Sequence, residues 1–208
     1  MENCLDEIMV GVPEDIANLQ LPNPFLRDFY TDEAERIFWL NNTVENCAED
    51  LIKMIMRCNK EDKGKAPEDR KPIKIFIDSP GGDVVFMWSI IKMIEMSKTK
   101  VITINYCEAY SAAAEILAAG HERWAMPGSH VMVHNGGCSY IGQADQVEAR
   151  KKYFDKLTKK ATDRLLEKTK IDPKVFKKRA IVDWFFDENE ALENGIVDKI
   201  VTDFDEIF

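Results

Sequence analysis

Residues 101–120, VITINYCEAYSAAAEILAAG, join a strand-like segment to a helix-like one through a single serine. The β-branched run VITINY (101–106) predicts a buried strand, and the small residues after Ser111 begin an apolar helical pattern. A strand that leads directly into a helix is the repeating unit of a fold with parallel strands and right-handed crossovers. This stretch therefore predicts an α/β architecture.

The same alternation of strand and helix runs along the rest of the chain. Before residue 101, the pattern predicts strands at 36–40 and 73–78 and helices at 45–58 and from Asp83 to about Ser97. After residue 120, it predicts short strands at 123–126, 130–134 and 196–201, and helices at 143–170, after Pro173 and over 187–194, the last ending at Gly195. The whole pattern supports the α/β class.

The N-terminal part of the chain differs from the remainder. The 208 residues suffice for one domain with a sizeable core and an extension. Residues 1–35 are weakly patterned, and Pro13, Pro22 and Pro24 interrupt any long element there. We therefore expect an extended N-terminal arm over 1–35 and a single domain over 36–208.

Composition limits the partners and the compartment. The chain has 28 Lys and Arg against 37 Asp and Glu, a formal charge of −9, whereas binding to phosphates needs a basic face. The five cysteines show no CxxC spacing, so we expect neither a disulfide framework nor a metal site. Residues 1–10 lack the regions of a signal peptide, and no apolar run approaches the roughly 20 residues of a membrane helix. We expect a cytoplasmic protein that binds neither nucleic acid nor membrane.

Ser111 is placed where a hydroxyl can act as a nucleophile. It follows a predicted strand and begins a predicted helix, whose first backbone N–H groups have no partner within the helix. A hydroxyl at such a point can attack a carbonyl while backbone donors hold the resulting oxyanion. A serine at a helix start can equally serve only as a cap, so Ser111 alone does not decide the function.

The segment DSPGGDV (78–84) is a second candidate for the site. A Pro-Gly-Gly turn after a buried strand leaves backbone N–H groups free of side chains, and these can donate to a developing negative charge. The same residues also form ordinary tight turns.

Histidines and aspartates supply candidates for a base and an acid. His134, at the end of a predicted strand and beside a loop, could act as a general base, with His121 and His130 as rivals. Asp183 is flanked by apolar side chains, so we expect it to be partly buried and to need a partner. Asp78 is the alternative acid, and spacing along the chain does not choose between the two.

From about residue 73 to 201 the chain resembles the proteolytic subunit of the Clp protease (ClpP). Four segments match in order: IFIDSPGGDV (75–84), EAYSAAAEILAAG (108–120), MPGSHVMVH (126–134) and VDWFFDENEALENGIVDKIV (182–201). The resemblance implies the ClpP/crotonase-like α/β fold, with repeated β-β-α units and a protruding handle helix at about 143–170.

The resemblance also implies roles for individual residues. It makes Ser111 the nucleophile, His134 the base and Asp183 the acid of a catalytic triad, with the backbone N–H groups of Gly82 and Ala112 as the oxyanion hole. It implies no cofactor.

The resemblance further implies an assembly. The handle helix would pack two heptameric rings face to face, so we expect a homo-oligomer that encloses its active sites and takes polypeptides as substrates. A Clp-family ATPase unfoldase is the partner that this implies, although residues 1–35 do not show the family's pore-loop pattern.

Two residues near the nucleophile depart from the family's pattern. Tyr110 stands where the family has a small residue, and Glu115 stands where an apolar residue is expected. We expect Gly81, Tyr110 and Glu115 around the substrate pocket, where Glu115 would disfavour acidic substrates or pair with another subunit.

The function predicted on these grounds is that of a serine endopeptidase confined within a ring. A capsid or scaffold maturation peptidase of the phage type, with the same fold, is the alternative. A ring subunit without activity and a crotonase-like enzyme that stabilises a thioester enolate of coenzyme A are two further hypotheses.

Overall fold

The computed structural model describes residues 27–208, and internal contacts divide the chain into two units, Met1–Glu35 and Arg36–Phe208. In the first unit, helix α3 (Arg27–Glu35) is described. The expected extended arm is therefore wrong for this segment, where RDFYTDEAE has few breakers and can close a helix. The rest of the expected arm lies outside the described residues.

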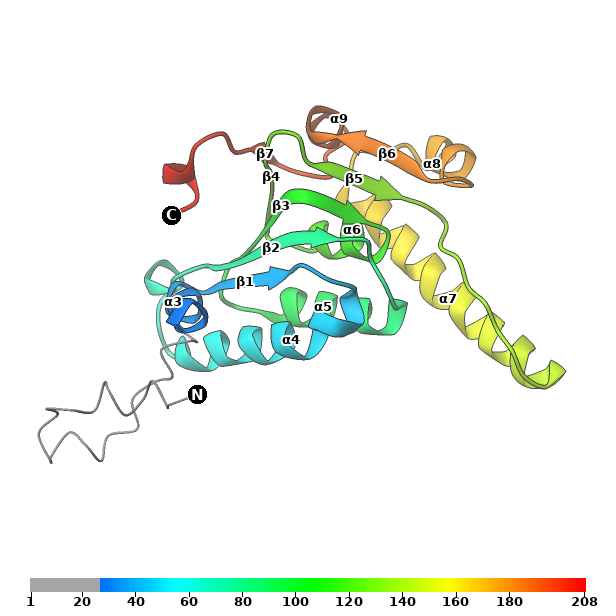
Figure 1. Ribbon diagram of the computed structural model, residues 1–208, viewed down its shortest axis with the longest axis horizontal. Coiled ribbons are helices and arrows are strands. Elements are labelled where there is room, and N and C mark those ends of the chain that lie inside the picture. The colour runs from blue at the N-terminus through cyan, green and yellow to red at the C-terminus, as the bar shows by residue number, and fades with distance from the viewer. Residues whose placement is uncertain (1–26) are drawn as a thin grey trace, which may run out of the picture. The chain divides into compact units, whose positions relative to one another are not determined.

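Residues 36–208 contain one seven-stranded sheet (Figure 1). Its strands are β1 (Ile37–Leu40), β2 (Ile73–Ser79), β3 (Val101–Tyr110), β4 (Glu122–Ala125), β5 (His130–Val133), β6 (Trp184–Asp187) and β7 (Lys199–Ile200). The main path runs β1-β2-β3-β4-β7, while β5 pairs with the end of β3 and β6 pairs with β5. All these pairs are parallel except β5–β6.

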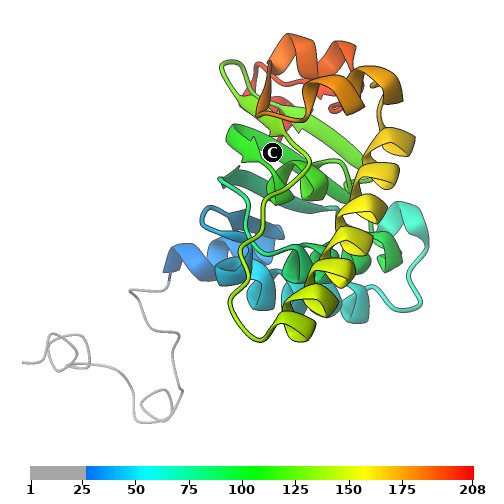
Figure 2. The same ribbon diagram turned by 90° about the vertical axis from the view of Figure 1, so that its right-hand side faces the viewer.

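Helices alternate with the strands, which confirms the predicted α/β class. They are α4 (Val44–Glu61), η2 (Pro67–Asp69), α5 (Val84–Met96), α6 (Ala112–Leu117), α7 (Ala144–Lys168), α8 (Pro173–Arg179), α9 (Glu188–Glu193) and η3 (Phe204–Glu206). Figures 1 and 2 show α4, α5 and α6 on one face of the sheet, and α7 running away from it as a long projecting helix.

The core follows the two-residue period of the strands. Ile73, Ile75 and Ile77 of β2 point into the larger core between the sheet and its helices, whereas Phe76 belongs to a smaller cluster on the other face. Because successive side chains of a strand point to opposite faces, each face has its own apolar layer. The larger core also holds Ala112–Ala114 of α6, and this packing seats the helix that follows Ser111.

Three strands differ clearly from the expectations. Strand β3 continues past residue 106 to Tyr110, because its second half pairs with β5. Strand β6 was not expected as a strand, and it exists because WFFD (184–187) pairs antiparallel with β5. The final strand is limited to Lys199–Ile200.

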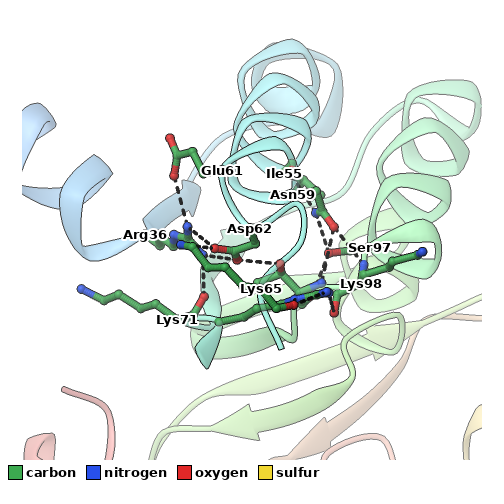
Figure 3. A network of polar contacts seen from close by, with 11 residues as sticks. Arg36, Ile55, Asn59, Glu61, Asp62, Lys65, Lys71, Ser97 and Lys98 are labelled. Atoms are coloured by element: carbon green, nitrogen blue, oxygen red, sulfur yellow. Dashed lines mark hydrogen bonds and ion pairs between the residues drawn. The ribbon is translucent and has the colours of Figure 1, made fainter. Parts of the chain in front are cut away.

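A buried ion pair fixes the end of α4 against the start of β1 (Figure 3). The Arg36 guanidinium donates to Asp62 Oδ2 at 2.6 Å and to the Lys71 carbonyl at 2.8 Å. The Asp62 side chain is fully buried, and it also accepts from Thr99 Oγ1 at 2.8 Å. Arg36 holds the pKa of the Asp62 carboxyl well below its usual range. This cluster links the end of α4 to the start of β1 and to the segment before β3.

Candidate active site

Strand register brings three distant segments to one end of the sheet. Strand β5 lies between β3 and β6, with Tyr110 opposite Met132 and Val133 opposite Trp184. His134 and Asp183 are the residues just beyond the last of these pairs, Val133 and Trp184, and the Ser111 N–H donates to the Met132 carbonyl at 2.8 Å. The three side chains therefore meet because one short strand pairs on both of its edges.

Ser111 occupies a sharp turn between β3 and α6. Its φ of 54° and ψ of −117° lie in a backbone region that residues other than glycine rarely adopt. Its hydroxyl makes no capping hydrogen bond to the helix that it begins. Instead, Ser111 Oγ lies 2.6 Å from His134 Nε2, so the hydroxyl is directed at an imidazole rather than at the backbone.

The acidic partner of His134 is Asp183, at a longer distance. His134 Nδ1 and Asp183 Oδ1 are 3.6 Å apart, which is within reach of an ion pair but longer than a hydrogen bond. The expectation that Asp183 is partly buried is wrong, since its side chain is 57% exposed. The reason is that residues 181–183 form a surface turn and bend before β6, so the apolar Ile181 and Val182 are exposed as well.

The other candidate acid and bases serve different parts of the fold. Asp78 accepts a hydrogen bond from the Glu108 N–H at 3.3 Å. His121 Nδ1 accepts from the Val101 N–H at 2.9 Å, at the opposite end of β3 from Ser111. His130 is exposed at the start of β5. The structure thus brings His134, and neither of its rivals, to Ser111.

The two residues expected to supply backbone donors border the same cavity as Ser111. Gly82, Ser111, Ala112 and His134 line one cavity. Within residues 27–208, the structure shows no hydrogen bond from the N–H of Gly82 or of Ala112. The close packing of the Gly81 backbone against Tyr110 and Ser111 requires glycine. Its φ is 99°, and a Cβ there would lie 2.6 Å from the Tyr110 carbonyl oxygen and 2.9 Å from Ser111 Cβ.

Residues 80–83, between β2 and α5, form a glycine loop that contains Gly81 and Gly82. A residue that the sequence analysis missed holds this glycine loop in place. Glu45, in the first turn of α4, accepts a hydrogen bond from the Asp83 N–H through Oε2 at 3.0 Å. This hydrogen bond lowers the pKa of the Glu45 carboxyl. The Val44 N–H also donates to the Gly81 carbonyl at 2.9 Å. The sequence signal is weak, because an acidic residue in a first turn is common as a helix-stabilising charge.

The cavity beside Ser111 has a volume of about 590 Å³ and is bounded by α5, α6 and α7. Among the three residues expected around the substrate pocket, Glu115 lines it. The ring of Tyr110 packs edge-on against Phe185, with 5.5 Å between their centroids. Gly81 is buried in the glycine loop.

Glu115 is unusual in its electrostatics. Its Oε2 is buried and has no hydrogen-bond partner. Burial raises the pKa of the Glu115 carboxyl to about 8, with the Arg164 charge opposing that shift. The side chain is therefore mostly protonated at neutral pH.

The described residues offer neither a metal-binding cluster nor a membrane-spanning helix. Across positions 27–208, no group of three or more His, Cys, Asp and Glu side chains is arranged to hold a metal ion. None of the helices described has the length and apolarity needed to cross a membrane.

Comparison with known proteins is consistent with this geometry. The model of the Clp protease family matches residues 29–204, a range that contains Ser111, His134 and Asp183. A curated relative, the ATP-dependent Clp protease proteolytic subunit 2 of Treponema denticola, is 36% identical over 132 residues. The aligned part is 62% of this chain and 66% of that relative, slightly less than two thirds of its length.

Proposed function

Because this chain belongs to the Clp protease family, we propose that it is a serine endopeptidase that hydrolyses peptide bonds in polypeptides. One observation carries the proposal: Ser111 Oγ lies 2.6 Å from His134 Nε2, within reach of direct proton transfer. A serine that served only as a helix cap would direct its hydroxyl to the backbone instead.

The proposed reaction begins with attack of Ser111 Oγ on the carbonyl carbon of the scissile bond. His134 Nε2 takes the hydroxyl proton and then returns it to the leaving amine as the C–N bond breaks. Water, deprotonated by the same nitrogen, hydrolyses the acyl-enzyme and restores Ser111. The N–H groups of Gly82 and Ala112 hold the negative oxygen in both steps, and each such donor contributes about 3 kcal/mol.

Asp183 is proposed to orient the imidazole. Its carboxylate faces Nδ1 at 3.6 Å, so an approach of ~1 Å would form a hydrogen bond to the Nδ1 proton. That bond holds the tautomer whose Nε2 accepts a proton, and the negative charge favours the imidazolium that forms. Catalytic hydrogen bonds are often long before substrate binds and shorten in the complex.

We further propose that the chain acts in a closed homo-oligomer, a heptameric ring or a stacked double ring, and with an ATPase unfoldase. Ile141, before α7, is 91% exposed, and Tyr153 on α7 is 58% exposed. Apolar side chains on a projecting helix suit a contact between copies of the chain. The aligned relative is named as an ATP-dependent protease subunit, which supports the ATPase partner.

The proposal is tested by labelling the full-length protein with a fluorophosphonate and by digestion of an unfolded protein. We expect the label on Ser111, and we expect Ser111→Ala to lose the label and at least about 10³-fold in the rate of peptide hydrolysis. Ser89→Ala is the matched control, because its hydroxyl bonds to the Val85 carbonyl within α5. Absence of labelling in every assembly state would overturn the proposal in favour of an inactive ring subunit.

A further inference from the structure

Glu115 lies one helical turn beyond the proposed nucleophile. Residues four apart on a helix are neighbours on the same side, so Glu115 follows Ser111 along the face of α6 that borders the cavity. Both residues line that cavity, together with His134. Glu115 therefore borders the space in which a substrate side chain could lie during attack by Ser111.

Within the described residues, Glu115 Oε2 has no hydrogen-bond partner, and the only cation whose charge acts on the carboxyl is Arg164, whose Nη2 is also buried without a hydrogen-bond partner. Arg164 of α7 is near, but its Nε is paired with Glu95 Oε1 at 2.7 Å, and its Nη1 lies 3.5 Å from the backbone carbonyl of Glu115. No ion pair joins Arg164 to the Glu115 carboxylate in residues 27–208. Two further charged side chains line the cavity, Asp83 and Arg150, which are exposed and of opposite sign.

The remaining walls suit a long aliphatic stem. Val84 and Met87 of α5 border the cavity on one side, and Leu157 and Ala161 of α7 border it on the other. A cavity with apolar walls and a buried acidic group at Glu115 is an arrangement that accepts lysine or arginine, whose stems are apolar and whose ends are charged. An acidic side chain would instead meet a second carboxyl group in an apolar setting.

We propose that this cavity receives the substrate side chain on the amino side of the scissile bond, and that Glu115 makes it select lysine or arginine there. The inference rests on the proposed peptidase function. A bound ammonium or guanidinium group supplies the partner that the buried carboxylate lacks, so the charged pair forms only when a basic side chain is present. A pocket without this carboxyl would instead favour an apolar side chain such as leucine.

The test uses the full-length assembled protein and quenched fluorescent peptides that differ only at the position before the cleaved bond: Lys, Arg, Leu or Glu. We expect the wild type to cleave after Lys or Arg with at least about 10-fold higher kcat/KM than after Leu, and after Glu most slowly. Glu115→Gln, which keeps the shape, should lose that preference, and Glu115→Leu should prefer leucine. Glu148→Gln removes an exposed charge on α7 and should leave the preference unchanged.

A second measurement does not depend on the variants. Peptide aldehydes that end in arginine or in leucine should compete with fluorophosphonate labelling of wild-type Ser111, the arginine form at a concentration about 10-fold lower or less. If Ser111 is labelled but leucine is preferred, or if Glu115→Gln keeps the basic preference, the specificity inference is overturned and the peptidase proposal stands. If Ser111 takes no label, the proposed function fails and the inference fails with it.

Discussion

Ser111 and Glu115, one turn apart on the same helix, both carry local costs that the fold tolerates. The φ of 54° at Ser111 is a strained conformation for a residue with a side chain, with a cost of about 1–3 kcal/mol. Glu115 buries a carboxyl oxygen without a hydrogen bond. Such costs persist where the surrounding packing determines the geometry, and here Ala113, Ala114 and Ile116 of α6 are completely buried.

At the residue scale, Glu115 should make stability depend on pH. Its pKa is about 8 in the folded chain and 4.5 in the unfolded one, so the folded state holds the extra proton between these values. The free energy of unfolding should therefore fall as the pH rises from about 5 to 8, by at most about 1.4 kcal/mol per pH unit. We expect Glu115→Gln to raise Tm relative to wild type more at pH 8 than at pH 5, measured by thermal unfolding.

The same scan on Glu148→Gln provides the reference, because that carboxylate is exposed. An equal Tm difference between Glu115→Gln and wild type at both pH values would show that Glu115 is charged throughout, and would contradict its burial as a neutral acid.

At the element scale, the glycine loop is held by the start of α4 rather than by its own turn. Ser79 Oγ donates to the Asn42 carbonyl at 2.6 Å, and Glu45 accepts the Asp83 N–H. Asp83 in turn caps α5 by accepting from the Val85 N–H at 2.7 Å. The loop that carries the proposed oxyanion donor is thus tied to two helices, which fixes the direction of its N–H groups.

Removal of the Glu45 contact should therefore weaken catalysis without preventing substrate binding. We expect Glu45→Ala to lower kcat by about 10- to 100-fold with little change in KM, because the oxyanion donor acts in the transition state. Glu45→Gln keeps an acceptor and should recover most of the rate. Glu49→Ala is the matched control, since Glu49 pairs with Lys53 on the exposed side of the same helix.

Two outcomes would show that the contact serves only the packing of α4. One is an unchanged kcat with a KM that rises enough to account for the whole drop in kcat/KM, and the other is equal rates for Glu45→Ala and Glu49→Ala.

At the scale of the whole molecule, α7 joins the site to the expected assembly. Its C-terminal part packs on the domain, where the Trp88 indole N–H donates to the Leu157 carbonyl at 3.4 Å and Leu165 is buried. Its first turns and the segment before it are exposed, including Ile141. One face of the cavity and the projecting surface therefore belong to the same helix, so contacts made by that surface can influence the pocket.

A charge at Ile141 should separate stacked rings. We expect Ile141→Lys to shift the native mass from a double ring towards a single ring, because the interface would have to bury an unpaired ammonium group. Met96→Lys, at an exposed apolar position at the end of α5, should keep the mass of the wild type. An unchanged native mass for Ile141→Lys would place the contact between copies elsewhere on the chain.

Much of this architecture can be predicted from local pattern. The strand before Ser111, the turn at 78–84 and the cap at Asp83 follow from side-chain preferences within a few residues, and all three are present. Strand β6 could not be predicted in this way, because four residues with no alternation form a strand only when β5 offers its edge. Glu45 could not be predicted either, since its role depends on a loop 38 residues further along the chain.

The sequence by itself determined the alternation of strands and helices, the α/β class and the residue types that could carry a hydrolytic reaction, because these depend on periodicity and on short motifs. Only the tertiary structure decided that His134 rather than His121 meets Ser111, that Asp183 is exposed and that a carboxyl oxygen of Glu115 is buried without a hydrogen-bond partner. The physical reason is that local preferences orient a side chain relative to its own backbone. Contacts between distant segments depend on which strands pair, and in which register.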